Sequence, residues 1–118
     1  MQIRCHRDLD VWQRGMDMVA EIYQLTNHFP VSERFGLTTQ LTRAAVSVPS
    51  NIAAGSARRS AAGFSRFLDI AQGSLAEVET QLEIARRIGL IDSYSGLNNE
   101  LVSIRRMLVG LQQHLRRK

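Results

Sequence analysis

The sequence predicts an all-α protein: a single domain over residues 1–118 that forms an antiparallel up-down-up-down four-helix bundle. Two observations lead to this prediction. Apolar residues recur every three or four positions along four segments, and no alternating pattern typical of strands competes with them. The connections are only a few residues long, so neighbouring helices should run in opposite directions. With 118 residues, 44% of them hydrophobic, the chain is long enough to bury one core.

The first helical segment extends from about Leu9 to His28. We expect Asp8 to cap its start and Pro30 to end it, because the residue before a proline is driven out of the helical region. Two apolar rows run along this segment. One contains Trp12, Met16, Val19 and Tyr23, and its neighbour contains Val11, Met18, Ile22, Leu25 and Phe29.

The second segment opens at Ser32-Glu33 and extends to about Ala57. Its apolar row contains Leu37, Leu41, Ala44 or Ala45, Val48 and Ile52. Pro49 falls inside this row and predicts a kink, because proline removes a backbone donor and collides with the preceding turn. Two separate helices, with Pro49 opening the second, are the alternative. The nearby Ser47, Ser50 and Asn51 would satisfy the freed carbonyls or line a polar pocket at the bend.

The third segment begins at Ser60 as N-cap and ends at Gly89. Its apolar face contains Phe64, Phe67 or Leu68, Ala71, Leu75, Val78, Leu82, Ala85 and Ile88. Gly73 in mid-helix is unfavourable by roughly 1 kcal/mol relative to alanine, so we expect it to allow a close helix approach. The fourth segment follows Asp92 or Ser93, and its heptad seam contains Leu97, Leu101, Ile104, Leu108, Leu111 and Leu115.

Motifs for catalysis are missing, so we expect neither an enzyme nor a cofactor. Di-iron bundles need Glu-x-x-His, and nucleotide-binding loops need glycine-rich motifs, and the sequence contains neither. Metal-capable side chains occur in Cys5-His6-x-Asp8-x-Asp10, but with no partner elsewhere we expect no metal. A small ligand or metal at that segment or at the Pro49 bend is a third, weaker hypothesis. The single cysteine, the polar N-terminus and the short apolar runs predict a cytoplasmic protein without a membrane span.

Charge is distributed in blocks along the chain. Of the 15 basic residues all but Lys118 are arginines, the acids number 11, and the net charge is +4. Residues 30–66 carry a net +4, residues 67–83 a net −4 and residues 84–118 a net +5. The planar fork of arginine suits phosphate and carboxylate alike. The blocks therefore predict either a polyanionic partner or contacts between subunits.

Pairs of arginines supply the candidate binding residues. Antiparallel packing would place the start of the third helix beside the end of the fourth, so that separate basic stretches share one end of the bundle. The candidate phosphate contacts are Arg58, Arg59, Arg66, Arg105, Arg106, Arg116, Arg117 and Lys118. A solvated face that keeps the protein in solution is the alternative interpretation. Trp12, Tyr23, Phe29, Phe64 and Phe67 all fall on apolar rows, so only Phe35 and Tyr94 are expected at the surface, too few for a stacking platform.

The run from Phe35 to Gly55, FGLTTQLTRAAVSVPSNIAAG, resembles the signature of the 23S rRNA intervening-sequence proteins, a bacterial family of four-helix bundles. Three further stretches are similar to it: Leu9–Gln13, Phe29-Pro30 with Glu33-Arg34, and Arg66–Leu82. The likeness covers about Leu9 to Leu90, and the fourth helix matches only in character.

The resemblance implies a ring-like pentamer encoded within intervening sequences of large-subunit rRNA genes or by separate genes. A related branch includes the accessory protein of diversity-generating retroelements, a basic pentamer thought to bind nucleic acid and the reverse transcriptase. No enzymatic activity is attached to the family. Ala54 replaces the acid of the usual Asn-Ile-Ala-Glu-Gly, and Gly63 stands where the family favours another acid, so both changes raise the local positive charge.

We therefore expect a non-enzymatic homo-oligomer, pentameric by resemblance, that binds nucleic acid, with RNA favoured over DNA. The alternative is an interaction scaffold whose charges serve self-assembly. In that case the acidic stretch from Asp69 to Glu83 would meet arginines of a neighbouring subunit.

Overall fold

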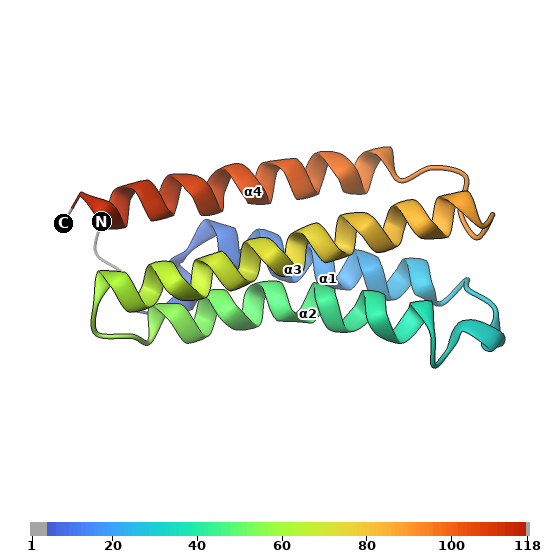
Figure 1. Cartoon of the computed structure of the whole chain (residues 1–118), viewed down its shortest axis with the longest axis horizontal. Helices are drawn as coiled ribbons and strands as arrows, with labels where there is room; N and C mark the ends of the chain where they lie inside the picture. Colours follow the sequence, from blue (N-terminus) through green and yellow to red (C-terminus); the bar gives the residue numbers. More distant parts are fainter. Residues whose placement is uncertain (1–4, 118) are drawn as a thin grey trace.

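The computed structural model describes residues 5–117, which form helices and connecting turns. The long helices are α1 (Asp10–Thr26), α2 (Leu37–Ser56), α3 (Ala61–Arg87) and α4 (Ser95–Arg116), and two short 3-10 helices, η1 (His6–Asp8) and η2 (Val31–Glu33), precede α1 and α2. Successive long helices run in opposite directions along a body of 47 × 23 × 19 Å (Figure 1). The predicted all-α four-helix bundle is confirmed.

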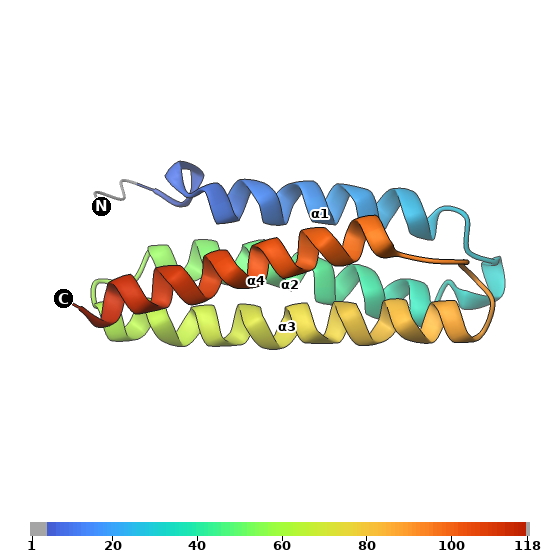
Figure 2. The ribbon, with the colours of Figure 1, turned by 90° about the horizontal axis from the view of Figure 1, so that it is seen from above.

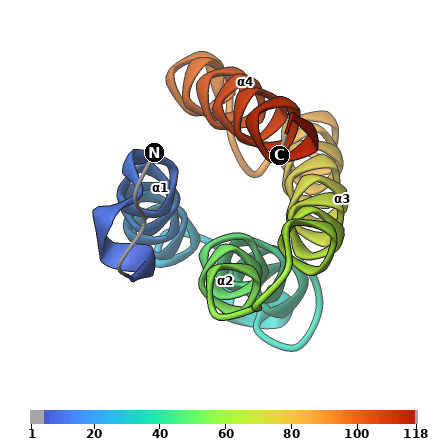
Figure 3. The same ribbon diagram turned by 90° about the vertical axis from the view of Figure 1, so that its left-hand side faces the viewer.

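The helices follow one another around a shared core, as the view along the bundle shows (Figure 3). Each contributes one apolar face, and the largest fully buried side chains come from all four helices: Met18, Ile22, Leu41, Val48, Ile52, Leu68, Leu75, Val78, Leu82, Leu101, Ile104 and Leu108. The heptad seam predicted for the fourth helix is confirmed from Leu101 to Leu115, and Leu97 is half-buried.

Of the two apolar rows predicted for α1, only one lies in the core. Met18 and Ile22 are fully buried, whereas Met16 is 43% exposed and Tyr23 is 50% exposed. The prediction that Tyr23 packs in the core is therefore wrong. A helix on the rim of a bundle buries only the part of its circumference that faces its neighbours, and the second row falls outside that part.

The start of α1 also differs from the prediction. Leu9 is the N-cap residue of α1, and Asp8 belongs to η1, where its carboxylate accepts the Cys5 N–H at 3.2 Å. Asp8 therefore closes the preceding short turn and does not cap α1, because a short acidic side chain readily bonds a nearby backbone donor.

α2 begins later than expected and ends at Ser56, next to the predicted end at about Ala57. Ser32 and Glu33 lie in η2, and the Glu33 carboxylate then accepts the Leu37 N–H at 3.2 Å at the start of α2. The helix runs without interruption through Pro49, so the alternative of two helices is wrong. The kink itself stays a prediction.

The polar residues around Pro49 bond to one another. Asn51 Nδ2 donates to the Ser47 carbonyl at 2.8 Å and to Ser47 Oγ at 2.9 Å. Ser47 Oγ in turn lies 2.7 Å from Ser74 Oγ of α3. These bonds tie α2 to α3 and use the polar groups that the sequence places beside the proline.

Both ends of α3 agree with the sequence. Ser60 Oγ accepts the Gly63 N–H at 3.0 Å, as an N-cap does, and Gly89 has a φ of 85° just after the helix. A glutamate in place of Gly63 would stand at the third helical position, where its side chain could complete a capping box with Ser60. Ile88 is 57% exposed, so its predicted place on the core face is wrong.

The close approach between helices occurs at Gly55 and not at Gly73. Gly73 is exposed, and a Cβ there would meet nothing within 4 Å. A Cβ on Gly55 would instead lie 2.8 Å from the Phe67 Cβ and 2.9 Å from the Phe64 Cδ1. Gly55 therefore lets the end of α2 press against the start of α3, and it sets the turn that carries Arg58.

Candidate nucleic-acid interface

One end of the bundle gathers arginines from three segments. The α2–α3 turn, the first turns of α3 and the last turn of α4 all lie at this end, together with the start of α1 (Figure 2). These segments carry Arg58, Arg59, Arg66, Arg116 and Arg117, which we call the basic end. Lys118, the remaining candidate of this group, lies outside the described residues.

The arginines of the basic end are available to a ligand. All five are exposed, and within residues 5–117 none of them makes an ion pair. The Arg58 guanidinium lies 4.5 Å from the centre of the Phe67 ring, so its plane rests on an aromatic face. Asp10 and Asp69 are acids near this end, and neither is paired with these arginines in the described part of the chain.

A hollow of about 410 Å³ opens at the basic end between α3 and α4. It is lined by Ala61, Ala62, Ser65, Arg66, Asp69, Leu115 and Arg116. Two arginines and one aspartate thus line a concave surface of the size of a small ligand site.

A buried amide lies beside this hollow. Gln112 is only 5% exposed, and its Nε2 donates to Asp69 Oδ1 at 2.7 Å and to the Ser65 carbonyl at 3.0 Å. Its Oε1 accepts from Gln72 Nε2 at 2.6 Å. The amide therefore holds the Asp69 carboxylate in one orientation.

The other two candidates do not reach the basic end. Arg105 Nη2 donates to Glu79 Oε2 at 2.7 Å, so its charge is already paired across α3 and α4. Arg106 is exposed, but it lies ten residues before Arg116, about 15 Å away along the helix axis. We therefore separate both from the group that could grip a single ligand at the end of the bundle.

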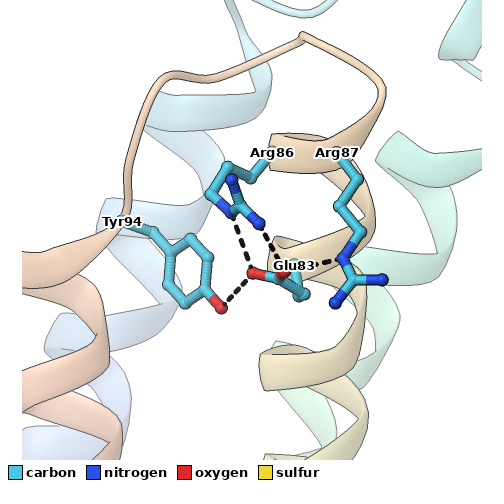
Figure 4. Close-up of polar contacts among 4 residues, drawn as sticks. All are labelled: Glu83, Arg86, Arg87 and Tyr94. Atoms are coloured by element: carbon cyan, nitrogen blue, oxygen red, sulfur yellow. Dashed lines mark hydrogen bonds and ion pairs between the residues drawn. The ribbon is translucent and has the colours of Figure 1, made fainter.

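The opposite end holds a compact ionic cluster around Glu83 (Figure 4). The Glu83 carboxylate accepts from Arg86 at 2.7 Å and from Arg87 at 2.8 Å, and it also accepts the Tyr94 hydroxyl at 2.7 Å. The hydrogen bonds from Arg86 and Arg87 hold the pKa of Glu83 far below its usual range. The hydrogen bond to Glu83, with burial second, raises the pKa of Tyr94.

This cluster should make stability depend on pH. A carboxyl group whose pKa is lower in the folded state stabilises the protein at every pH above its unfolded pKa of about 4.3. This contribution is lost as the pH falls from the unfolded pKa through the lower pKa of the folded state. Glu83→Gln should therefore lower the melting temperature at pH 7, and its difference from the wild type should shrink between about pH 5 and pH 2. Circular dichroism melts across this range measure the effect.

The matched control is Glu77→Gln, which neutralises an exposed acid of the same helix. Glu77 makes no hydrogen bond or ion pair within residues 5–117, so this change should leave the melting temperatures nearly unaltered. Equal behaviour of the two variants at every pH would show that the cluster contributes nothing.

The structure reveals polar pairs that sequence reasoning missed. Arg14 makes a two-pronged contact with Glu100, at 2.6 and 3.1 Å, and also donates to Ser103. The hydrogen bond to Glu100 raises the pKa of Arg14. Sequence reasoning also missed Gln112, and a polar side chain next to the seam residue Leu111 is the signal that could have drawn attention to it.

An apolar groove of about 360 Å³ lies between α1 and α2. It is lined by His6, Trp12, Met16, Val19, Val46, Pro49, Ser50 and Ala53. Met16 and Val46 are 43% and 39% exposed, so this face leaves large apolar side chains in contact with water.

Within residues 5–117 no three His, Cys, Asp or Glu side chains lie close enough together to hold a metal ion. In the same part of the chain, each helix is either too short or too polar to cross a membrane.

The four helices place the chain in the class of all-α bundle proteins. The chain belongs to the 23S rRNA-intervening sequence protein family, whose sequence pattern matches residues 7–110. A solved structure of a protein of unknown function from the S23 ribosomal protein family of Bacteroides thetaiotaomicron is similar, with a TM-score of 0.78 and 26% identity. The similarity covers 86% of this chain and 97% of that one. A comparison with curated proteins finds no match.

Proposed function

We propose that this protein is a non-enzymatic RNA-binding homo-oligomer of the bacterial cytoplasm that grips RNA through arginine–phosphate contacts. The observation that carries the proposal is the basic end, where Arg58, Arg59, Arg66, Arg116 and Arg117 are exposed and unpaired within residues 5–117. Unpaired arginines on one solvent-exposed surface present planar guanidinium groups, which can donate two parallel hydrogen bonds to phosphate oxygens.

The choice of RNA over other polyanions rests on the family. Its description refers to the intervening sequence of 23S rRNA, which favours a structured RNA as the partner. Binding through phosphates alone would tolerate many sequences, so no particular base sequence is proposed.

A salt series with a structured RNA tests this function. Five phosphate contacts predict that the logarithm of the binding constant falls with the logarithm of salt concentration with a slope of about −3.5 to −4.5. Fluorescence anisotropy of a labelled RNA hairpin between low and physiological salt measures this slope. Affinity weaker than millimolar at low salt, or affinity that salt does not change, would exclude phosphate gripping.

Self-assembly has its own support in the apolar groove between α1 and α2. Figure 3 shows α3 on the opposite side of the bundle from α1, and α3 exposes Ile70 and Ile84, at 46% and 43%. A groove on one side and apolar side chains on the other suit a head-to-tail contact with a second copy, and such contacts form a ring when the rotation between copies closes. The family resemblance makes five the expected number of copies.

The charges support assembly less well than this groove. The acidic stretch from Asp69 to Glu83 was expected to meet a neighbouring subunit, but two of its four acids, Glu79 and Glu83, are bonded to arginines of the same chain. The scaffold alternative would therefore act through apolar burial.

Mass measurement by light scattering tests the assembly. The wild type should have several times the mass of one 13.3 kDa chain, and Met16→Asp should reduce it because a charge would be buried in the contact. Val31→Asp is the control, because Val31 is 87% exposed in η2, outside the groove. A monomeric wild type, or an unchanged mass for Met16→Asp, would contradict the proposed interface.

A further inference from the structure

The hollow at the basic end combines groups that a plain phosphate site does not need. Arg66 and Arg116 would attract a phosphate, but Asp69 lies in the same hollow and would repel it. A carboxylate beside two arginines favours a ligand that brings a hydrogen-bond donor as well as a negative charge. The chemistry of the hollow is therefore that of an anion carrying a nearby hydroxyl or amino group.

Asp69 is held in position for such a donor. Gln112 Nε2 donates to its Oδ1 at 2.7 Å, and no hydrogen bond from residues 5–117 reaches its Oδ2. Gln112 is itself buried in the seam between α3 and α4, where an apolar residue would pack more simply. A buried amide that orients an exposed carboxylate is a positioning device, and it leaves one oxygen free to accept.

Resting on the proposed function, we infer that this hollow binds one ribonucleotide unit of the RNA. Its phosphate would lie between Arg66 and Arg116, and its ribose 2′-hydroxyl would donate to Asp69 Oδ2. In a ribonucleotide the phosphate and the 2′-hydroxyl are joined through the sugar, so one unit supplies both groups.

This arrangement selects RNA against DNA. Deoxyribose has no 2′-hydroxyl, so a DNA strand would bring its phosphate near the carboxylate without the compensating hydrogen bond. Losing the hydrogen bond to the Asp69 carboxylate should cost a DNA strand more affinity than losing a hydrogen bond to a neutral acceptor, because a hydrogen bond to a charged acceptor is stronger. The volume of about 410 Å³ falls in the range of small-ligand sites.

Competition between matched single strands tests the inference. The probes are RNA, DNA and 2′-O-methyl RNA of one sequence, measured with wild type and with Asp69→Ala at the same salt concentration. Wild type should bind RNA about tenfold or more tightly than DNA, and 2′-O-methyl RNA should behave as DNA does because it has no hydroxyl proton to donate. Asp69→Ala should bind DNA more tightly than wild type does and should bring the RNA-to-DNA ratio close to one.

The ratio is measured on one protein preparation, so a loss of folded protein cancels from it. Glu77→Ala is the matched control, because it removes an exposed acid of α3 that is not part of the hollow, and it should keep the preference for RNA. Salt-dependent binding with equal affinity for RNA and DNA, or a preference that persists in Asp69→Ala, would overturn the inference but leave the proposed function intact. Failure to bind any of the three strands would overturn both.

Discussion

Gly55→Ala should lower the free energy of unfolding by about 1–3 kcal/mol, the usual cost of overpacking a filled interior. The added Cβ would lie 2.8 Å from the Phe67 Cβ, 2.9 Å from the Phe64 Cδ1 and 3.2 Å from the Phe64 carbonyl oxygen. The Phe64 carbonyl oxygen is part of the α3 backbone and the Phe67 Cβ is bonded to it, so neither can turn away. The strain can be relieved only if α2 and α3 move apart.

Chemical denaturation followed by circular dichroism measures the change, and Gly73→Ala is its control. A Cβ on Gly73 would meet nothing within 4 Å, so alanine there should raise stability by about 0.5–1 kcal/mol through helix propensity alone. The two identical substitutions should therefore have opposite signs. A neutral or stabilising Gly55→Ala would mean that the helices do not approach as closely as described.

The double variant Arg66→Glu with Arg116→Glu should weaken RNA binding by about 100-fold or more. Each change removes a charge-assisted phosphate contact and adds a repulsive charge in the same hollow. Losing two contacts should also make the salt slope shallower by about 1.4–1.8. The anisotropy titration described above reports both quantities.

A control must change the net charge equally without touching the basic end. Arg34→Glu with Arg43→Glu does this, because both arginines are exposed and neither lies in the basic end. This pair should reduce affinity much less than the hollow variant does. Equal losses would show that overall charge, and not the geometry of the basic end, controls binding.

Most of the fold could be predicted from the spacing of apolar residues in the sequence alone. In α4 the seam from Leu101 to Leu115 is buried as predicted, because a face that repeats every three or four residues can only be covered by packing against other helices. The ends of α3 at Ser60 and Gly89 could also be predicted from the sequence, because helix capping depends on residues that are close together along the chain. The family, too, could be recognised from motifs in order.

The candidate site needed three dimensions. The periodicity of α1 does not show which of its two apolar rows faces the core, because that depends on which part of its surface the neighbouring helices cover. For this reason the prediction for Tyr23 is wrong. From the sequence, all the arginine pairs were equal candidates. In the structure, Glu79 of α3 forms an ion pair with Arg105 of α4, whereas Arg66 and Arg116 line one hollow.

The sequence by itself therefore determined the helices, their order and the basic character of the chain, since these follow from neighbours along the polypeptide. Only the tertiary structure decided which charges are paired, which converge, and that Gln112 holds Asp69 beside two arginines. The Glu79–Arg105 and Asp69–Gln112 contacts join residues 26 and 43 positions apart, so they exist only after the bundle has closed.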